Sequence, residues 1–394
     1  MCAGKCHLRH PELIPRLTLG ATPGPVPPSR YPRIVQEVNE LVIRHAHPDV
    51  VAFVGGGVLR REDREHALDV TLAPGATRPL GAGTRLRAEE ADPYRLCFER
   101  DLDRIKHSRP WRRLAGKCQV YVAPEDDHLR TRLTHAVEVA QVATGIARAV
   151  GLCVPLTEAI ALAHDCGHGP AGHASEEAFT PYVPGGYDHA VYGADVTLAP
   201  LNLCFETLDG VRNHSWRRPA PATPEGEVVA WADRIAYVCH DFSDAVRAGI
   251  LQPDDLPEEV ADVVGRSQSR QIGAFVRAAF DAIDRTGHVG MTEPAAGALA
   301  RFREFNFDRI YLRPAARQQA DKVVGLLRGL VDFFVDAPTR MPIDATDMHA
   351  DLVPGSAEAA AVAVRYVSGM TDRYALGLGV ELLGWRSEHL PRGV

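Results

Sequence analysis

Apolar residues recur at intervals of three and four through most of the chain after residue 91, which is the spacing of amphipathic helices. The clearest stripe runs from Leu133 to Val150 and stops at Gly151. A second helix is expected to begin near Thr157 and to end at Gly167. Further helices are expected at residues 225–249, 257–264, 270–285, 294–305, 314–336 and 356–384. The pattern predicts a mostly α fold.

The first ninety residues follow a different pattern. Residues 1–31 include the proline-rich run GATPGPVPPSRY, which is typical of a flexible arm. Apolar spacing predicts a helix from Tyr31 to His45, and two short apolar runs predict strands at Val50–Val54 and Ala67–Leu72. We therefore expect an N-terminal extension over residues 1–90, with the arm and a small α/β element, and a helical domain over residues 91–385.

Side chains that bind metals or transfer protons are dense between residues 130 and 189. They are His135, His164, Asp165, His168, His173, Glu176, Asp188 and His189. His135 falls in the first turn of the first predicted helix, and the adjacent pair His164 and Asp165 falls in the last turn of the second. Imidazole and carboxylate together accept Mn, Fe, Co, Ni, Zn or Mg, so we expect a divalent metal site. The alternative is a helix C-terminal pair in which the helix dipole favours the imidazolium.

A second informative stretch, residues 225–249, predicts a buried helix with one polar stripe. Asp233, Tyr237, His240, Asp241 and Asp244 fall on one face of a helix that is otherwise strongly apolar. Buried carboxylates are costly unless they are paired, so the stripe is expected to line a site, with Asp233 as the fourth metal ligand. The alternative is a stripe that faces solvent.

Composition limits the classes of protein that need consideration. The chain has 394 residues, 45% hydrophobic and 24% charged, with a net charge of −7, so no general positive field recruits nucleic acid. Eight scattered cysteines favour reduced buried thiols in a cytoplasmic protein over a disulfide framework. Neither a run of 18 apolar residues nor a charged and apolar leader is present, so no membrane association is expected.

Weaker signals have simpler explanations. Gly55-Gly56-Gly57 follows a predicted strand, but without the remaining positions of a phosphate-binding loop it predicts a plain turn. Cysteines and histidines near the N-terminus have a cramped spacing for zinc, and a structureless arm is favoured over a metal site at Cys2, Cys6, His7 and His10. Arg132 is different, because it lies one helical turn before His135 and is expected to meet an anion beside the metal.

Six strings, in order, resemble one known family. His135, His164-Asp165 and Asp233 repeat the order of the HD-domain metallophosphohydrolases. Within that group, the chain resembles the bacterial deoxyguanosine triphosphate triphosphohydrolase branch through FERDLDRIKHSRPWRRLAGKCQV, RTRLTHAVEVAQ, EAIALAHDCGHGPAGHASE, NLCFETLDGVRNH, ADRIAYVCHDFSDAVRAGI and SGMTDRYA. The resemblance covers residues 91 to about 380. It implies an HD-domain helical core, a nucleoside triphosphate substrate, one divalent metal ion and a homo-oligomer, tetramer or hexamer.

The resemblance also implies roles for individual residues. Four would ligate the metal: His135, His164, Asp165 and Asp233. Four would serve catalysis. His173 and Glu176 would form a His–carboxylate pair, His189 would donate a proton to the leaving oxygen, and His168 would lie in the phosphate pocket. Three would contact deoxyribose: Gln119, Tyr237 and Asp241. Two would contact phosphate: Arg132 and Arg234.

The implied reaction is hydrolysis of a (deoxy)nucleoside triphosphate to the nucleoside and tripolyphosphate. The chain departs from the family at Cys118, Ala171 and Ala190, where Thr, an aromatic residue and Asn or an acidic residue are usual, and this puts substrate choice in doubt. Two other functions stay open. An HD phosphodiesterase or 5′-nucleotidase would not need the sugar-contacting residues, and a nucleotide-sensing regulatory protein would not need a proton-transfer pair.

Overall fold

The computed structural model describes residues 54–122, 124, 126–342 and 352–391 in full, residues 46–47, and the backbone of 35–38 and 41–44. The chain divides into two compact units, residues 1–58 and 59–394, so residues 59–90 belong with the helical unit. The segment with Cys2, Cys6, His7 and His10 lies outside the described residues, as does the strand expected at Val50–Val54 apart from its last residue.

The described part of the first unit contains a two-stranded antiparallel sheet. Strand β1 (Val35–Val38) pairs with β2 (Leu41–Arg44), with Val35 opposite Arg44. The helix expected from Tyr31 to His45 is therefore wrong. Most of the apolar residues in this segment are β-branched, and such side chains favour an extended backbone even where their spacing also fits a helix.

The described residues of the second unit form helices joined by loops. Its first half contains α1 (Arg61–Thr71), α2 (Cys97–His107), α3 (Arg109–Arg113), α4 (Arg132–Val150), α5 (Val154–Ala163), α6 (His173–Phe179), α7 (His189–Tyr192), α8 (Phe205–Asn213) and α9 (Pro224–Arg247). Its second half contains α10 (Glu258–Val264), α11 (Gln268–Thr286), α12 (Glu293–Asn306), α13 (Pro314–Asp336), α14 (Ala357–Ser368) and α15 (Asp372–Leu383). The mostly α fold is confirmed.

Two boundaries differ from the sequence prediction. Of the residues expected to form a strand at Ala67–Leu72, all but Leu72 belong to α1, which begins with a charged turn where Arg61 pairs with Glu65 one turn later. The helix expected over 356–384 is two helices, because the chain turns at Gly369 and starts again after Thr371.

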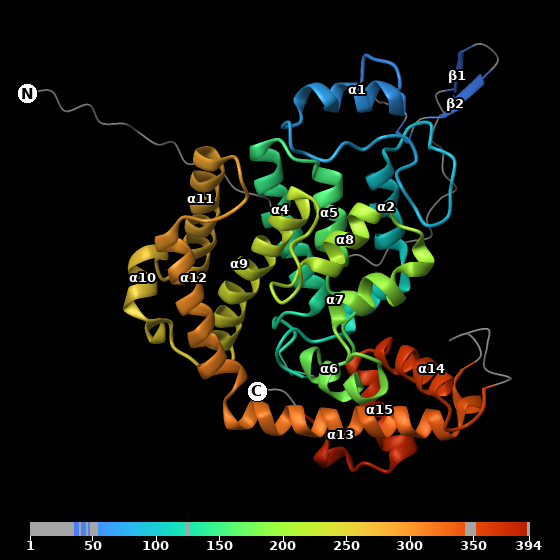
Figure 1. Cartoon of the computed structure of the whole chain (residues 1–394), viewed down its shortest axis with the longest axis vertical. Helices are drawn as coiled ribbons and strands as arrows, with labels where there is room; N and C mark the ends of the chain where they lie inside the picture. The colour runs from blue at the N-terminus through green and yellow to red at the C-terminus, as the bar shows by residue number, and fades with distance from the viewer. Residues whose placement is uncertain are drawn as a thin grey trace, which may run out of the picture. The chain divides into compact units, whose positions relative to one another are not determined.

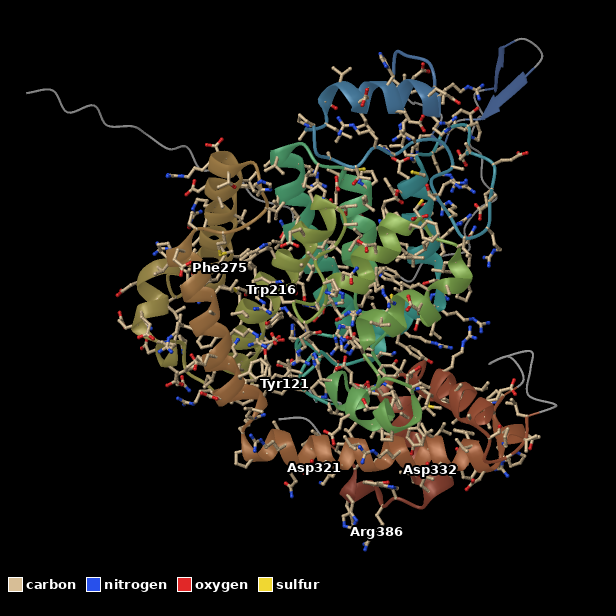
Figure 2. The ribbon with its side chains drawn as sticks, in the orientation of Figure 1. Tyr121, Trp216, Phe275, Asp321, Asp332 and Arg386 are labelled. Atoms are coloured by element: carbon tan, nitrogen blue, oxygen red, sulfur yellow. The ribbon has the colours of Figure 1, made fainter. Side chains whose placement is uncertain are left out.

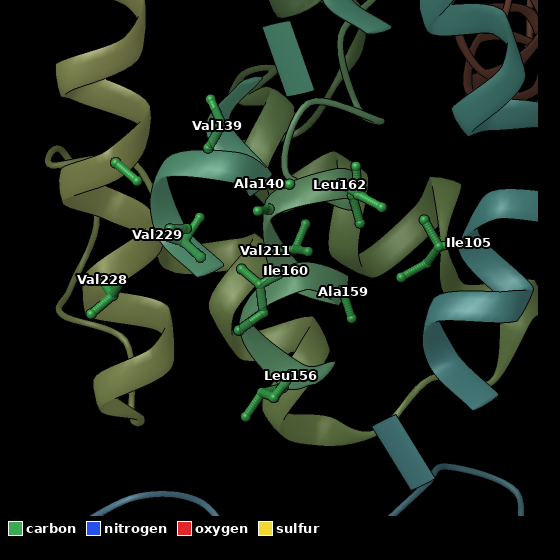
Figure 3. Close-up of a cluster of buried hydrophobic side chains, with 14 of the residues drawn as sticks. Ile105, Val139, Ala140, Leu156, Ala159, Ile160, Leu162, Val211, Val228 and Val229 are labelled. Atoms are coloured by element: carbon green, nitrogen blue, oxygen red, sulfur yellow. The ribbon is translucent and has the colours of Figure 1, made fainter. Parts of the chain in front are cut away.

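Helices α4, α5 and α9 pack against one another and lie side by side in the helical unit (Figure 1). Their facing apolar side chains, with those of α2 and α8, form the main core, in which Figure 3 shows Val139 of α4, Ile160 of α5 and Val228 of α9. Burying each such side chain stabilises the fold by roughly 1.5–3 kcal/mol. The three helices that position the predicted metal ligands therefore belong to the main core.

Two further clusters flank this core. Helices α11 and α12 pack against α9, and α10 packs against both of them; the cluster includes Phe275, which is fully buried and is labelled in Figure 2. Helices α13 and α14 pack with α6 around Leu330 and Phe334. No helix in the described residues combines the length and the apolar character needed to cross a membrane.

Candidate active site

Two histidines and a carboxylate meet where α4, α5 and α9 come together. His135 Nε2 lies 3.1 Å from Asp233 Oδ1, and His164 Nε2 lies 3.7 Å from the same oxygen. One ligand atom from each residue lies within 4.8 Å of those of the other two. Thr131 caps α4 by accepting a hydrogen bond from Thr134 N, which fixes the first turn of the helix and so the position of His135.

His164 is oriented by its own backbone. It follows the last residue of α5, and its Nδ1 lies 2.7 Å from the carbonyl oxygen of Ala161. Because a carbonyl can only accept, Nδ1 carries the hydrogen, and in the neutral ring Nε2 then has the lone pair. That Nε2 is buried and has no hydrogen-bond partner within the described residues. An unpaired acceptor beside His135 and Asp233 fits a divalent cation.

Asp165 joins this cluster to a buried cation of the chain. Its Oδ2 accepts a hydrogen bond of 2.7 Å from Arg132 Nη1, and its Oδ1 lies 3.4 Å from His164 Nε2 and 3.3 Å from His168 Nε2. Burial by itself would raise the pKa of Asp165, but Arg132 and the two imidazoles hold that pKa well below its usual range. These neighbours therefore favour the ionised carboxylate form of Asp165.

The guanidinium of Arg132 lies beside Asp165 and has N–H groups that no described residue accepts from. It is 1% exposed, and its Nε and Nη2 have no hydrogen-bond partner within the described residues. Gly172 makes room for the guanidinium, since a Cβ at that position would lie 2.2 Å from Nη2. Unpaired buried N–H groups are costly, so the arrangement fits an anion that accepts from them.

A second row of imidazoles lies beside Asp165. His168 stacks on His189 with ring centroids 3.7 Å apart. His189 Nδ1 donates a short hydrogen bond to Glu176 Oε1; burial alone would lower the pKa of His189, but this carboxylate raises it. The structure thus pairs Glu176 with His189, whereas the family resemblance implied a pair with His173. His173 is exposed, with its ring 5.1 Å from that of His168.

The loop that carries His168 is held from the C-terminal part of the unit. Asp372 accepts hydrogen bonds from the backbone N–H groups of Cys118 and Ala171, at 2.9 and 2.8 Å. Lys117 Nζ donates to the carbonyl oxygens of Ser368 and His168, the first at 2.9 Å. The string SGMTDRYA, far from the metal ligands in sequence, therefore fixes the backbone beside them.

His214 is a site residue that sequence reasoning missed. It is 2% exposed, and its Nε2 lies 3.2 Å from His189 Nε2. Ligand atoms of His164, Asp165 and His214 lie within 4.8 Å of one another. The signal was present, because the string NLCFETLDGVRNH ends in this histidine and places it at the end of a helix, as His164 is placed.

The polar stripe of α9 divides into two groups. Asp241, His240 and Asp244 are 2–4% exposed, so a stripe that faces solvent is wrong. Asp244 pairs with Arg130, and His240 Nδ1 lies 3.2 Å from Glu138 Oε2, so these two side chains tie α9 to α4 and its N-terminus. The other group of the stripe lines the site and consists of Asp233, Tyr237 and Asp241.

Tyr237 and Asp241 have partners that the sequence did not reveal. Tyr237 OH accepts a hydrogen bond of 2.9 Å from Arg303 Nε, and Asp241 Oδ2 accepts a short one from Tyr311 OH. Burial raises the pKa of Asp241 to about 7, against the lowering effect of Tyr311. Asp241 Oδ1 and Gln119 Oε1 are buried without a hydrogen-bond partner among the described residues, so both can accept from a ligand.

Arg234 lies against an aromatic platform. Its guanidinium carbon is 3.4 Å from the ring centre of Trp216, which is labelled in Figure 2, and the indole nitrogen of Trp216 donates to Ala230 O at 3.2 Å. Arg234 Nε is buried and has no hydrogen-bond partner within the described residues. A cation–π contact of this kind holds the guanidinium in one orientation.

Two known protein families match parts of this chain. Residues 132–238 match the HD domain family, and residues 289–379 match the phosphohydrolase-associated domain. A crystal structure of a hypothetical protein from Aquifex aeolicus covers 74% of this chain and 69% of its own, with a TM-score of 0.46 and 15% identity.

Relatives named deoxyguanosinetriphosphate triphosphohydrolase-like protein are similar over most of their length. The one from Caldanaerobacter subterraneus is 38% identical over 321 residues, which is 80% of this chain and 92% of the relative. The one from Clostridium tetani is 35% identical, over 80% of this chain and 94% of the relative. The chain therefore belongs to the deoxyguanosinetriphosphate triphosphohydrolase-like family of HD-domain proteins.

Proposed function

We propose that this protein hydrolyses a (deoxy)nucleoside triphosphate to a nucleoside and tripolyphosphate, with a divalent cation at His135, His164, Asp165 and Asp233. The observation that carries the proposal is the juxtaposition of this donor set with Arg132, which is buried and has two guanidinium nitrogens without partners among the described residues. A cation next to unpaired N–H donors suits a phosphate group, whose oxygens can meet both.

Arg132 and Arg234 would bind the polyphosphate. Arg132 is held by Asp165 through one nitrogen and keeps its others for phosphate oxygens. Arg234 follows Asp233 in sequence, and Trp216 orients its guanidinium. When bound, the divalent ion would draw charge from the phosphoryl group that is attacked.

Proton transfer would fall to the imidazoles. Glu176 accepts the Nδ1 hydrogen of His189, which turns His189 Nε2 toward Asp165 Oδ1 at 4.0 Å. In this orientation His189 can hold a proton at Nε2 and give it to the leaving oxygen. His173 is the exposed imidazole of the group and can exchange protons with solvent.

The sugar would lie along α9. Tyr237 and Asp241 stand one and two turns beyond Asp233, which is roughly 6–12 Å at the rise of an α-helix and matches the reach of a sugar from its α-phosphate. Asp241 Oδ1 and Gln119 Oε1 lack hydrogen-bond partners among the described residues, so they can accept from sugar hydroxyls. This order supports attack at the α-phosphate, which breaks the bond to the 5′ oxygen and releases tripolyphosphate intact.

The experiment is product analysis with a panel of nucleotides and Mn²⁺ or Mg²⁺ in water labelled with ¹⁸O. We expect deoxynucleoside and tripolyphosphate, with the label in the tripolyphosphate. Monophosphate with pyrophosphate would contradict attack at this phosphorus. Turnover of only monophosphates or cyclic nucleotides would favour the phosphodiesterase or 5′-nucleotidase, and binding without turnover would favour the sensor.

Two variants connect the products to the site. Asp165→Ala should lose the metal as well as turnover, since Asp165 is one of four protein ligands in the proposal. Asp241→Ala should keep the metal and weaken nucleotide binding. Asp244→Ala is the matched control, because Asp244 lies on the same stripe but pairs with Arg130. Equal nucleotide affinity in the wild type and Asp241→Ala would contradict the placement of the sugar.

We also propose a homo-oligomer, a tetramer or hexamer, on the family resemblance. Apolar residues of the C-terminal helices α13 and α14, such as Leu330 and Val364, are buried within the subunit, so they do not support it. A solution mass equal to the 42.9 kDa of one chain would refute it.

A further inference from the structure

Asp372 is a buried carboxylate that contacts two separate segments of backbone, both of which lead to Arg132. It is the first residue of α15 and is 4% exposed. Its Oδ1 accepts a hydrogen bond of 2.8 Å from Ala171 N, and its Oδ2 accepts one of 2.9 Å from Cys118 N. Because a single carboxyl group accepts both hydrogen bonds, it fixes the separation of the two segments.

The first segment pairs with the start of α4. Cys118 forms an isolated antiparallel bridge with Thr131, and Arg132 N donates a hydrogen bond of 2.9 Å to Lys117 O. Gln119, which is proposed to contact the sugar, follows Cys118 directly. A shift of the carboxylate would therefore move the backbone that positions both Arg132 and Gln119.

The second segment reaches the guanidinium end of Arg132. Ala171 has φ 58°, a left-handed conformation that a Cβ disfavours, and its N–H donates to Asp372 in that conformation. Gly172 follows, and a Cβ added to it would lie 2.2 Å from Arg132 Nη2. If Ala171 relaxed to an ordinary φ, Gly172 would move relative to the guanidinium. Backbone strain that the surroundings maintain is found at functional sites.

The close approach of α15 to the first segment depends on a glycine. A Cβ added at Gly116 would lie 2.7 Å from Thr371 Cγ2, in the residue before Asp372. Lys117 adds a second link, since its Nζ donates to Ser368 O at 2.9 Å and also to His168 O. The turn between α14 and α15 therefore contacts both segments beside Arg132.

We propose that Asp372 is a positioning residue for the hydrolysis: by fixing the backbone at Cys118 and Ala171, it aligns the guanidinium of Arg132 with the phosphate. The inference rests on the proposed function, which assigns Arg132 to the polyphosphate. The C-terminal helices would then contribute to turnover without touching the substrate. The rival role is structural only, in which Asp372 stabilises the start of α15 and has no effect on the reaction.

Asp372→Asn separates the two roles in the full chain loaded with Mn²⁺. The amide oxygen can still accept from one backbone N–H, but the amide nitrogen cannot accept from the other. We expect kcat/KM for the triphosphate to fall on the order of 10²-fold, the scale of a misplacement of about 1 Å, while metal per chain is unchanged. A lower urea midpoint with an unchanged kcat/KM would overturn the proposal.

Glu225→Gln is the matched control. Glu225 is fully buried in the first turn of α9 and accepts from the backbone N–H groups of Thr77 and Cys153, at 3.0 and 2.9 Å, so it resembles Asp372 in all but its distance along the fold from Arg132. Its substitution should lower the urea midpoint and leave kcat/KM unchanged. An equal fall of kcat/KM in both variants would show a general loss of structure and would overturn the proposal.

The left-handed residue gives a test by rescue. Glycine adopts φ 58° without strain, so Ala171→Gly should keep the loop in place without its hydrogen bond. Added to Asp372→Ala, it should recover kcat/KM by about 10-fold, the order of the strain that one Cβ imposes. A double variant no more active than Asp372→Ala would refute the part given to Ala171. If Asp372→Ala fails to fold, Gly116→Ala displaces Thr371 instead and should lower kcat/KM as Asp372→Asn does.

Binding of inorganic tripolyphosphate distinguishes this inference from the proposed function, because it needs no turnover. Asp372→Asn should weaken it about 10-fold, since a displaced Arg132 loses hydrogen bonds to charged oxygens. Weaker binding in a protein that releases pyrophosphate would refute the reaction and leave the role of Asp372 standing. Unchanged binding and an unchanged kcat/KM in a protein that releases tripolyphosphate would do the reverse.

Discussion

Gly172→Ala should destabilise the protein, because an added Cβ would collide with the guanidinium of Arg132. The loss of stability therefore measures how strongly its surroundings keep Arg132 in place. Gly172 precedes α6 with φ 61° and ψ −125°, a backbone conformation that residues with a Cβ rarely adopt. A Cβ there would lie 2.2 Å from Arg132 Nη2 and 3.2 Å from its Cζ. Arg132 is 1% exposed and bonded to Asp165 at 2.7 Å, so it cannot move aside without disturbing that pair.

The two costs can be separated. Backbone strain at such a residue is about 1–3 kcal/mol, and breaking a buried ion pair costs about 3–5 kcal/mol. The matched control is Gly287→Ala, because Gly287 ends α11 with φ 70° and a Cβ added there would meet no described atom within 4 Å. Its cost should be about 1–2 kcal/mol, that of the left-handed backbone alone. Gly172→Ala should therefore lose at least ~2 kcal/mol more than the control.

Urea unfolding of both variants at pH 7 measures the difference, since the shift in midpoint multiplied by the slope gives the change in the free energy of unfolding. Turnover should fall in Gly172→Ala and persist in Gly287→Ala, because only the first displaces a guanidinium from the proposed phosphate site. Losses of stability that agree within ~0.5 kcal/mol would refute the reasoning, since they would mean that Arg132 moves freely.

Three other outcomes are expected. Trp216→Ala should raise KM for the triphosphate about 2- to 30-fold, because the cation–π contact with Arg234 contributes about 0.5–2 kcal/mol; Trp216→Phe should recover most of this, and an unchanged KM in the alanine variant would contradict the role. The pKa of Asp241 is about 7 in the folded protein, above its unfolded value, so its stabilising contribution is complete below pH ~4 and is lost as pH rises through 7. The urea midpoint of the wild type minus that of Asp241→Asn should therefore fall as pH rises from ~4 through 7. A difference that does not change with pH would argue against the raised pKa. Removing metal with a chelator should lower Tm, since an ion present at 100 times its Kd stabilises the folded state by about 2.7 kcal/mol, and an unchanged Tm would mean that no ion is bound.

The helices that hold the site were predictable because their signals are local. The stripe from Leu133 to Val150 is long, begins at a capping threonine and ends at a glycine with φ 72°, and α4 follows it within one residue. The polar stripe of α9 was predictable for a similar reason, since five polar residues on one face of an apolar helix need partners. The three described ligand helices meet in the core, where tertiary packing and local preference agree.

The errors fall where the local signal is short. The segment from Tyr31 to His45 has apolar residues at a spacing that fits either a helix or a pair of strands, and residues 35–38 and 41–44 pair as strands. Ala67–Leu72 alternates well enough for a strand, but it continues a helix that Arg61 and Glu65 start and that the pair of Arg64 with Glu99 attaches to α2. A window of six residues contains neither pair.

The partners within the site could not be predicted for a different reason. Which histidine meets Glu176 depends on how α7 lies against α6, and the position of His214 beside His164 depends on how closely α8 approaches α5. Gly210 allows that approach, because a Cβ there would lie 2.4 Å from Ile160 Cδ1, and the same close contact sets the rings of His164 and His214 4.9 Å apart. The sequence displays the glycine and both histidines, but the distance between two helix ends is a property of their packing. A substitution such as Gly210→Val would push the two helices apart and so separate these histidines without altering either one.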